Sequence, residues 1–206
     1  MKEIRKLDIQ FRAEENEEDK MQIKGYAVVF NSPETYDYTE VISERALDDT
    51  DMSDVVLRYN HNDSFMVLAR TRNKSLKLEK DEKGLMIDAT LQNDITEHRN
   101  IFNAIKSGLI DKQSFAFSVD EDEYDYDTDT RTITKIGKLY DVSVVDQPFY
   151  NATDVSIASK NDDFLKRRNE LRKEHEEKIK EEKERQEKER QDALAQAKAK
   201  LLKKLG

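Results

Sequence analysis

MQIKGYAVVF, residues 21–30, carries the clearest structural signal in this chain of 206 residues. Its first half alternates apolar Met21 and Ile23 with polar neighbours, whereas Tyr26 to Phe30 is apolar without a break. Alternation with a period of two residues indicates a strand with one buried face, and a continuous apolar run indicates a strand covered on both faces. Residues 31–33, Asn-Ser-Pro, end the run, because proline lacks the N–H that a strand ladder needs. The segment therefore predicts a central strand of a sheet.

Similar segments on both sides of this strand predict a body made mainly of strands. One candidate precedes it at residues 6–12, where apolar and polar residues alternate. Further candidates follow at residues 55–59, 75–78, 84–91, 113–119, 132–136 and 139–145. Residues 94–108 predict a helix that ends at Gly108, and residues 43–47 predict a shorter one. We therefore expect an α+β body that is mainly β.

Charge divides the chain into two parts. The net charge is −9, and 39% of the residues are charged, against about 25% in an average protein. Residues 160–206 hold 16 basic and 12 acidic residues, a net +4, so residues 1–159 carry −13. So polar a chain cannot bury a core along its whole length, because ordering the backbone costs about 1–2 kcal/mol per residue. We expect one compact body and one solvated appendage.

The appendage has the pattern of a long charged helix. Residues 166–206 contain no proline and no glycine before the last residue, and acidic residues precede basic ones at a spacing of four, as in Glu174 and Lys178. No apolar residue occurs from Lys180 to Asp192, which excludes a continuous coiled-coil seam there. A short apolar stripe follows at Leu194, Ala197, Leu201 and Leu205. The tail is therefore predicted to be a solvated, coiled-coil-like helix, with a docking stripe for a partner as the alternative.

Several classes of function are excluded or disfavoured by composition. Without cysteine there is no disulfide framework, no thiolate nucleophile and no cysteine-ligated metal. No apolar run approaches about 18 residues, and the N-terminus lacks the apolar segment of a signal peptide, so we expect no membrane association. A net negative charge disfavours nucleic-acid binding. The acidic run 120–129 lacks the glycine and glutamate of a calcium loop and predicts an exposed hairpin loop, so no cofactor and no metal is expected.

A few polar residues lie where a catalytic group is plausible. His61 follows the apolar run 55–57 and is a candidate general base, whereas His98 lies within the predicted helix. Ser114 lies on a predicted strand and needs an adjacent base, because its hydroxyl is a poor nucleophile at neutral pH. Asp141, at the start of an apolar strand, is a plausible acid to orient that base. Each of these residues is more often structural, and the pattern does not show that they converge.

In their order along the chain, these segments resemble the tailed-phage prohead proteases of the HK97 type. The similar motifs are IKGYAVVFNS (23–32), YTEVISERAL (38–47), VVLRYNHND (55–63), LARTRNKSLKLEKDEKGLMIDATL (68–91), IKSGLIDKQSFAFSV (105–119) and LYDVSVVDQPFYNATDV (139–155). Glu44 and Arg45 replace the usual Pro-Gly of the second motif, and Ala69 stands where the family often has glycine. The resemblance covers about two-thirds of the chain.

The resemblance implies a fold and a set of site residues. Because these proteases are related to the herpesvirus assemblins, it implies a closed or nearly closed β-barrel flanked by helices. It assigns the nucleophile to Ser114 rather than Ser118, the catalytic histidine to His61 and the acid to Asp141. Asp146 and His98 are alternatives for the third member, His98 because assemblins use Ser-His-His. The predicted domains are a prohead protease domain at residues 1–158 and a charged helical tail at residues 159–206.

The function implied is that of a serine endopeptidase that cleaves scaffold and major capsid protein segments inside the immature prohead, in the host cytoplasm. A homodimer is possible. The tail is expected to recruit the enzyme into the assembling shell, to act as scaffold-like material, or to be removed by self-cleavage. The alternative is a catalytically inactive capsid-assembly or scaffolding protein with the same fold and tail.

Overall fold

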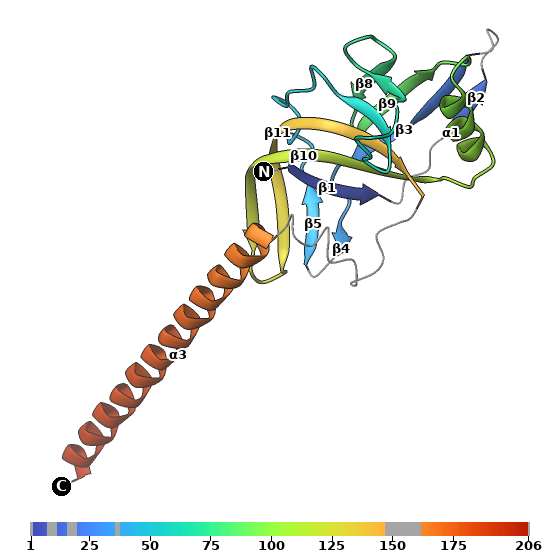
Figure 1. Ribbon diagram of the computed structural model, residues 1–206. Coiled ribbons are helices and arrows are strands. Elements are labelled where there is room, and N and C mark those ends of the chain that lie inside the picture. Colours follow the sequence, from blue (N-terminus) through green and yellow to red (C-terminus); the bar gives the residue numbers. More distant parts are fainter. Residues whose placement is uncertain (1, 8–11, 16–19, 36–37, 147–161, 206) are drawn as a thin grey trace. The chain divides into compact units, whose positions relative to one another are not determined.

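The computed structural model describes residues 2–7, 12–15, 20–35, 38–146 and 162–205 (Figure 1). The chain separates into two compact units, residues 1–160 and residues 161–206. The functional division into a protease domain and a tail at residue 158 stays a prediction.

The first unit contains eleven described strands and one described helix. Their bounds are β1 Lys2–Leu7, β2 Arg12–Glu15, β3 Met21–Val29, β4 Glu34–Thr35, β5 Thr39–Ile42, β6 Val56–Tyr59, β7 Ala69–Arg70, β8 Leu76–Lys80, β9 Gly84–Leu91, α1 Thr96–Lys106, β10 Lys112–Asp125 and β11 Thr130–Val145. The body is therefore α+β and mainly β, as predicted.

The strands form two sheets, and the long antiparallel hairpin of β10 and β11 is the centre of the larger one. The larger sheet has the order β1-β10-β11-β5-β4, and β6 pairs in parallel with another part of β11 while β7 pairs with β6. The smaller sheet has the order β2-β3-β9-β8. Strand β3, the segment at residues 21–30, is central in that sheet, as predicted from its apolar run. Its residues Ile23, Ala27 and Val28 are fully buried.

The prediction of a closed or nearly closed barrel is wrong. Among the described residues neither sheet returns to pair its last strand with its first. The edge of β11 that does not pair with β10 is shared by two short strands. Strand β5 pairs with residues 130–133 and β6 pairs with residues 141–144, so the sheet branches there. Register irregularities between Ala116 and Asp122 interrupt the β10–β11 ladder, and such irregularities bend and twist a strand. Apolar alternation predicts which faces are buried, whereas branching depends on pairings that the pattern does not contain.

The helix predicted at residues 94–108 is confirmed as α1, with Ile101, Phe102 and Ile105 buried on one side. Among the described residues of the first unit, α1 is the only helix.

Four local predictions need correction. Residues 44–49 form turns and not the short helix predicted at 43–47. The acidic run 120–129 is mostly strand, because β10 continues to Asp125 before the turn. The first strand spans residues 2–7 and not 6–12, and residues 8–11 lie outside the described part. The segments 132–136 and 139–145 join into the single strand β11.

The second unit contains helix α3, Asp162–Leu205, as predicted for the tail. Every side chain from Glu176 to Gln191 is exposed, and Leu194 of the apolar stripe is 58% exposed. The side chains of the other three stripe residues lie outside the described ones, so a docking stripe for a partner stays a prediction. Among the described residues no helix is long and apolar enough to cross a membrane.

Candidate active site

A tight turn at the end of β6 positions His61. The N–H of Asn62 donates to the carbonyl oxygen of Tyr59 at 3.0 Å, which closes a four-residue turn. Both central residues, Asn60 and His61, have positive φ angles of 52° and 53°, the property of a type I′ turn. The left-handed region is uncommon for residues other than glycine, and backbone strain of this kind is concentrated at functional sites. The His61 N–H donates to the hydroxyl of Ser143 at 3.1 Å, which ties the turn to β11.

The register of the β10–β11 hairpin brings the other two candidates to the same face. Ser114 lies opposite Ser143, and Ala116 lies opposite Asp141. Directly opposed residues share a face, and residues two apart along a strand share a face. Ser114, Ser143 and Asp141 therefore lie on the same face of the sheet. Strand β6 pairs in parallel with residues 141–144 of β11, so the turn that follows β6 lies next to these residues.

His61 lies between Ser114 and Asp141 and contacts both. Its Nε2 is 2.6 Å from the Oγ of Ser114, and its Nδ1 forms a short hydrogen bond with Oδ1 of Asp141. The side chain of His61 is 12% exposed and that of Asp141 is 3% exposed. The three predicted site residues, which are far apart in sequence, are thus within hydrogen-bonding distance in the fold.

Ser114, His61 and Asp141 form a row of hydrogen-bonded side chains, and the charge on Asp141 determines how this row is protonated. Burial raises the pKa of its carboxyl, but the hydrogen bonds and charges of His61 and Lys2 outweigh burial and hold the pKa below its ordinary value. Asp141 is therefore a carboxylate at neutral pH and accepts a hydrogen bond from Nδ1–H of His61. In neutral His61 this leaves a lone pair on Nε2, directed at the hydroxyl of Ser114. The row can therefore move a proton away from that hydroxyl.

The two alternative third members lie in other contacts. The carboxylate of Asp146 accepts a hydrogen bond from the Tyr59 hydroxyl at 2.7 Å. His98 is 3% exposed, its Nδ1 accepts from the N–H of Gln92 at 3.1 Å, and its Nε2 is 3.2 Å from the carbonyl oxygen of Val67. These contacts connect α1 to two neighbouring loops and give His98 a structural role.

Two residues at this site were not singled out from the sequence. Ser143 donates to Oδ1 of Asp141 at 3.1 Å and accepts from the His61 backbone, so it helps to position both. The sequence feature that could have indicated Ser143 is a hydroxyl residue two positions after an acid in an otherwise apolar strand. Lys2 forms an ion pair with Oδ2 of Asp141 at 3.0 Å. Nothing in the pattern of the N-terminus indicates this contact. Among the described residues no group of three or more potential ligands is arranged to hold a metal ion.

The model of the caudovirus prohead serine protease family matches residues 7–167. The chain belongs to this family. Among solved structures, the capsid assembly protease gp21 of bacteriophage T4 is similar to this prohead protease family member at 11% sequence identity. The similarity covers 69% of this chain and 98% of that chain, with a TM-score of 0.43. No curated protein sequence matches the chain.

Replacing His98 by glutamine tests its structural role. Burial lowers the pKa of His98, so the unfolded chain takes up this proton at higher pH than the folded chain does. The contribution of His98 to the free energy of unfolding is therefore greatest above about pH 6.5, the ordinary histidine value, and declines as the pH falls below it. We expect His98→Gln to remove this part of the decline, measured as urea unfolding free energy at a series of pH values. An unchanged pH profile of the unfolding free energy would contradict the structural role of His98 as a buried side chain.

Proposed function

We propose that this chain is a serine endopeptidase in which Ser114 is the nucleophile, His61 the general base and Asp141 the residue that orients His61. Its substrates are scaffold and major capsid protein segments, cleaved inside the immature prohead in the host cytoplasm. Family membership supports prohead proteolysis. The observation that supports the chemistry is the position of His61, whose two ring nitrogens contact Ser114 and Asp141.

In the first half of the reaction, the Oγ of Ser114 attacks the carbonyl carbon of the scissile peptide bond. His61 Nε2 takes the hydroxyl proton and becomes an imidazolium, which the carboxylate of Asp141 stabilises through Nδ1–H. The tetrahedral intermediate collapses, the C–N bond breaks, and His61 gives its proton to the leaving amine. The product is an ester between Ser114 and the N-terminal part of the substrate.

In the second half, water replaces the amine. His61 takes a proton from the water as its oxygen attacks the ester carbonyl, and then returns that proton to the Oγ of Ser114 as the ester bond breaks. The carboxylic acid product leaves and the resting row is restored. Asp141 stays ionised throughout, in agreement with its lowered pKa.

The competing hypothesis is an inactive assembly protein with the same fold. The contacts of His61 argue against it, because they hold a buried carboxylate and a strained turn next to one serine hydroxyl. Such an arrangement costs free energy, of the order of 1–3 kcal/mol for the strained backbone alone.

We also propose that residues 159–206 act in assembly and not in catalysis, as a module that recruits the enzyme into the shell. The exposure of its charged side chains from Glu176 to Gln191 supports a surface available to a partner. A homodimer remains a prediction.

The roles of Ser114 and Asp141 are tested by substitution. Ser114→Ala removes the nucleophile and should lower the rate of capsid-protein cleavage by about 10⁴-fold or more. Asp141→Asn keeps the shape but favours the wrong tautomer of His61, so we expect a smaller loss, up to about 10⁴-fold. Both rates are measured with purified full-length chain and mass spectrometry of the products.

The matched control is Ser118→Ala, on the same strand, because the Ser118 hydroxyl accepts from the N–H of Lys138 and does not contact His61. Its cleavage rate should match that of the unmodified chain. Cleavage by a pure Ser114→Ala protein would rule out Ser114 as the nucleophile, and an unchanged rate in Asp141→Asn would direct attention to Asp146 or His98.

The recruiting role of the tail is tested by deleting residues 159–206. The shortened chain should cleave soluble capsid protein within about twofold of the full-length rate, because its catalytic contacts lie in the first unit. It should be missing from purified proheads, as measured by quantitative mass spectrometry. Equal incorporation of both chains would contradict a recruiting tail.

A further inference from the structure

The N-terminal strand covers the nucleophile. Strand β1 lies beside β10 (Figure 1) and pairs with it in antiparallel register, from Lys2 opposite Ser118 to Leu7 opposite Gln113. Lys6 is thereby opposite Ser114, and the carbonyl oxygen of Arg5 accepts a hydrogen bond from the Ser114 hydroxyl at 2.7 Å. Ser114 is 0% exposed. A substrate therefore cannot reach the hydroxyl while β1 keeps this position.

This contact opposes the catalytic row directly. A serine hydroxyl has one hydrogen to donate, and the Arg5 carbonyl and Nε2 of His61 both compete for it. Strand β1 also places the Lys2 ammonium 3.0 Å from Oδ2 of Asp141, the carboxylate oxygen that does not contact His61. One six-residue strand thus contacts two of the three proposed catalytic residues.

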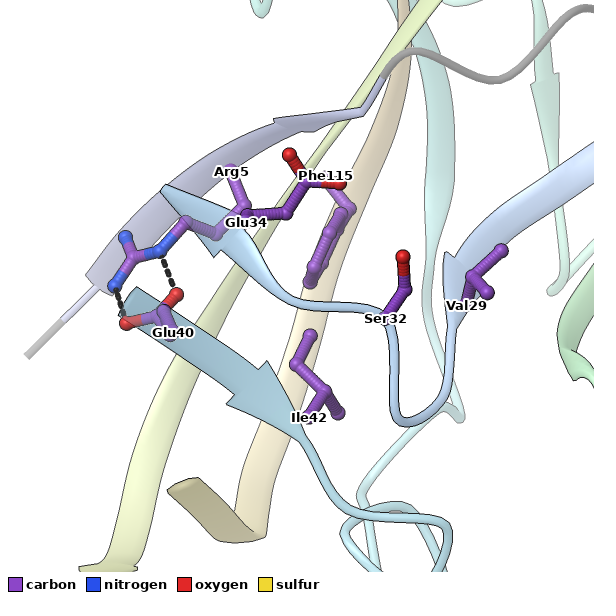
Figure 2. Close-up of a pocket in the computed structure, with 7 residues that line it drawn as sticks. All are labelled: Arg5, Val29, Ser32, Glu34, Glu40, Ile42 and Phe115. Carbon is purple, nitrogen blue, oxygen red and sulfur yellow. Dashed lines mark hydrogen bonds and ion pairs between the residues drawn. The ribbon is translucent and has the colours of Figure 1, made fainter. Parts of the chain in front are cut away.

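The side chain of Arg5 lies in a recess of acidic character. Its guanidinium hydrogen-bonds both carboxylate oxygens of Glu40 on β5, with Nη2 to Oε2 at 2.6 Å (Figure 2). Arg5 is 6% exposed and Glu40 is 3% exposed. The pocket beside it is also lined by Val29, Ser32, Glu34, Ile42 and Phe115. A planar, two-pronged contact of this kind selects arginine over uncharged residues.

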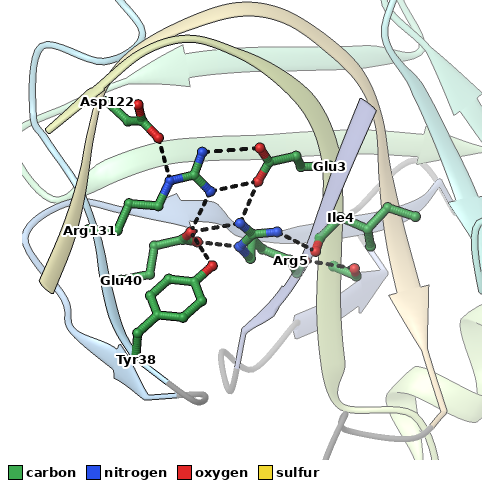
Figure 3. A network of polar contacts seen from close by, with 8 residues as sticks. Glu3, Ile4, Arg5, Tyr38, Glu40, Asp122 and Arg131 are labelled. Carbon is green, nitrogen blue, oxygen red and sulfur yellow. Dashed lines mark hydrogen bonds and ion pairs between the residues drawn. The ribbon is translucent and has the colours of Figure 1, made fainter. Parts of the chain in front are cut away.

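A second charge of β1 is matched in the same way. Glu3, two residues before Arg5, accepts from Arg131 of β11 at 2.9 and 3.1 Å (Figure 3). Arg131 also donates to Asp122 at 2.7 Å. The body therefore offers an acid for the Arg5 position and an arginine for the Glu3 position. Glu3 and Arg5 of β1 therefore each have a partner of opposite charge on the body.

From these contacts, and on the basis of the proposed function, we propose that β1 occupies the substrate-binding edge of β10 as a built-in mimic of the substrate. The substrate is then an extended peptide that pairs with β10 and carries the pattern Glu-x-Arg. Its arginine supplies the scissile carbonyl and is recognised by Glu40, and its glutamate is recognised by Arg131. Addition of a strand to a sheet edge is a common mode of peptide recognition.

By occupying the edge of β10, strand β1 also inhibits cleavage of other substrates. A strand attached to the same chain has an effective concentration in the millimolar range, so dilute substrate competes poorly with it. The interior of a shell holds its proteins at high concentration, where an extended Glu-x-Arg segment competes with β1 for the edge. Cleavage is thereby favoured after assembly.

The covering role is tested by weakening β1 and measuring access to Ser114. A fluorophosphonate phosphonylates an activated serine with loss of fluoride, and the rate is followed by mass spectrometry of the intact chain. Arg5→Gln removes the guanidinium from Glu40 and should speed modification of Ser114 at least about tenfold, the usual effect of losing a charged hydrogen bond. The matched control Lys24→Gln, which removes an exposed ion pair of the other sheet, should leave the rate unchanged.

The recognition role is tested with two peptidyl diphenyl phosphonates, Glu-Ile-Arg and Glu-Ile-Gln, on the Arg5→Gln chain. The arginine compound should react at least about tenfold faster, and adding Glu40→Gln should abolish that preference. Because the preference is a ratio of two rates on one protein, a general loss of stability does not mimic it. Should Arg5→Gln fail to fold, Glu3→Gln serves as the variant that weakens β1.

The outcomes separate this inference from the proposed function. Equal modification rates in the unmodified and Arg5→Gln chains, or equal rates for the two phosphonates, would overturn the inference while leaving Ser114 as the nucleophile. No modification of Ser114 in any variant would overturn the proposed function, and the inference with it.

Discussion

The pairing of β11 on both of its edges is the constraint on which the site depends. On one edge the antiparallel register with β10 places Ser114 opposite Ser143, and on the other the parallel register with β6 ends at Tyr59, just before His61. A shift of one residue in either register would move a side chain to the opposite face and separate the row. The serine, histidine and acid are therefore brought together by backbone hydrogen bonds, and the contacts between their side chains follow.

Buried charge connects this site to the N-terminal strand. Glu3, Arg5, Glu40 and Arg131 are all less than 9% exposed, and burial of that kind is tolerated only where each charge is paired and hydrogen-bonded. The pairing links β1, β5 and β11 through side chains although β1 and β5 share no ladder. A buried ion network contributes little net stability compared with apolar packing, whereas removing one partner is strongly destabilising because it leaves an uncompensated buried charge.

The sequence predicted the elements whose signal is local. Strand β3, helix α1 and the long α3 follow from apolar periodicity or charge spacing, and Ser114, His61 and Asp141 were selected through a family resemblance. Closure of a barrel was predicted wrongly, because the branching at β11 is a matter of long-range pairing. The first strand is predicted at residues 6–12 but lies at residues 2–7. The sequence pattern does not reveal it, because the burial of Glu3 and Arg5 depends on Glu40 and Arg131, which are distant in sequence.

We propose that Ser114 and His61 act as one unit, and a double-mutant cycle on the cleavage rate measures the coupling between them. The rates of the unmodified chain, Ser114→Ala, His61→Ala and the double variant are measured with the same capsid-protein substrate. Groups that act as a unit are strongly non-additive, so the double variant should be no slower than Ser114→Ala alone. Rate losses that multiply in the double variant would show that Ser114 and His61 act independently.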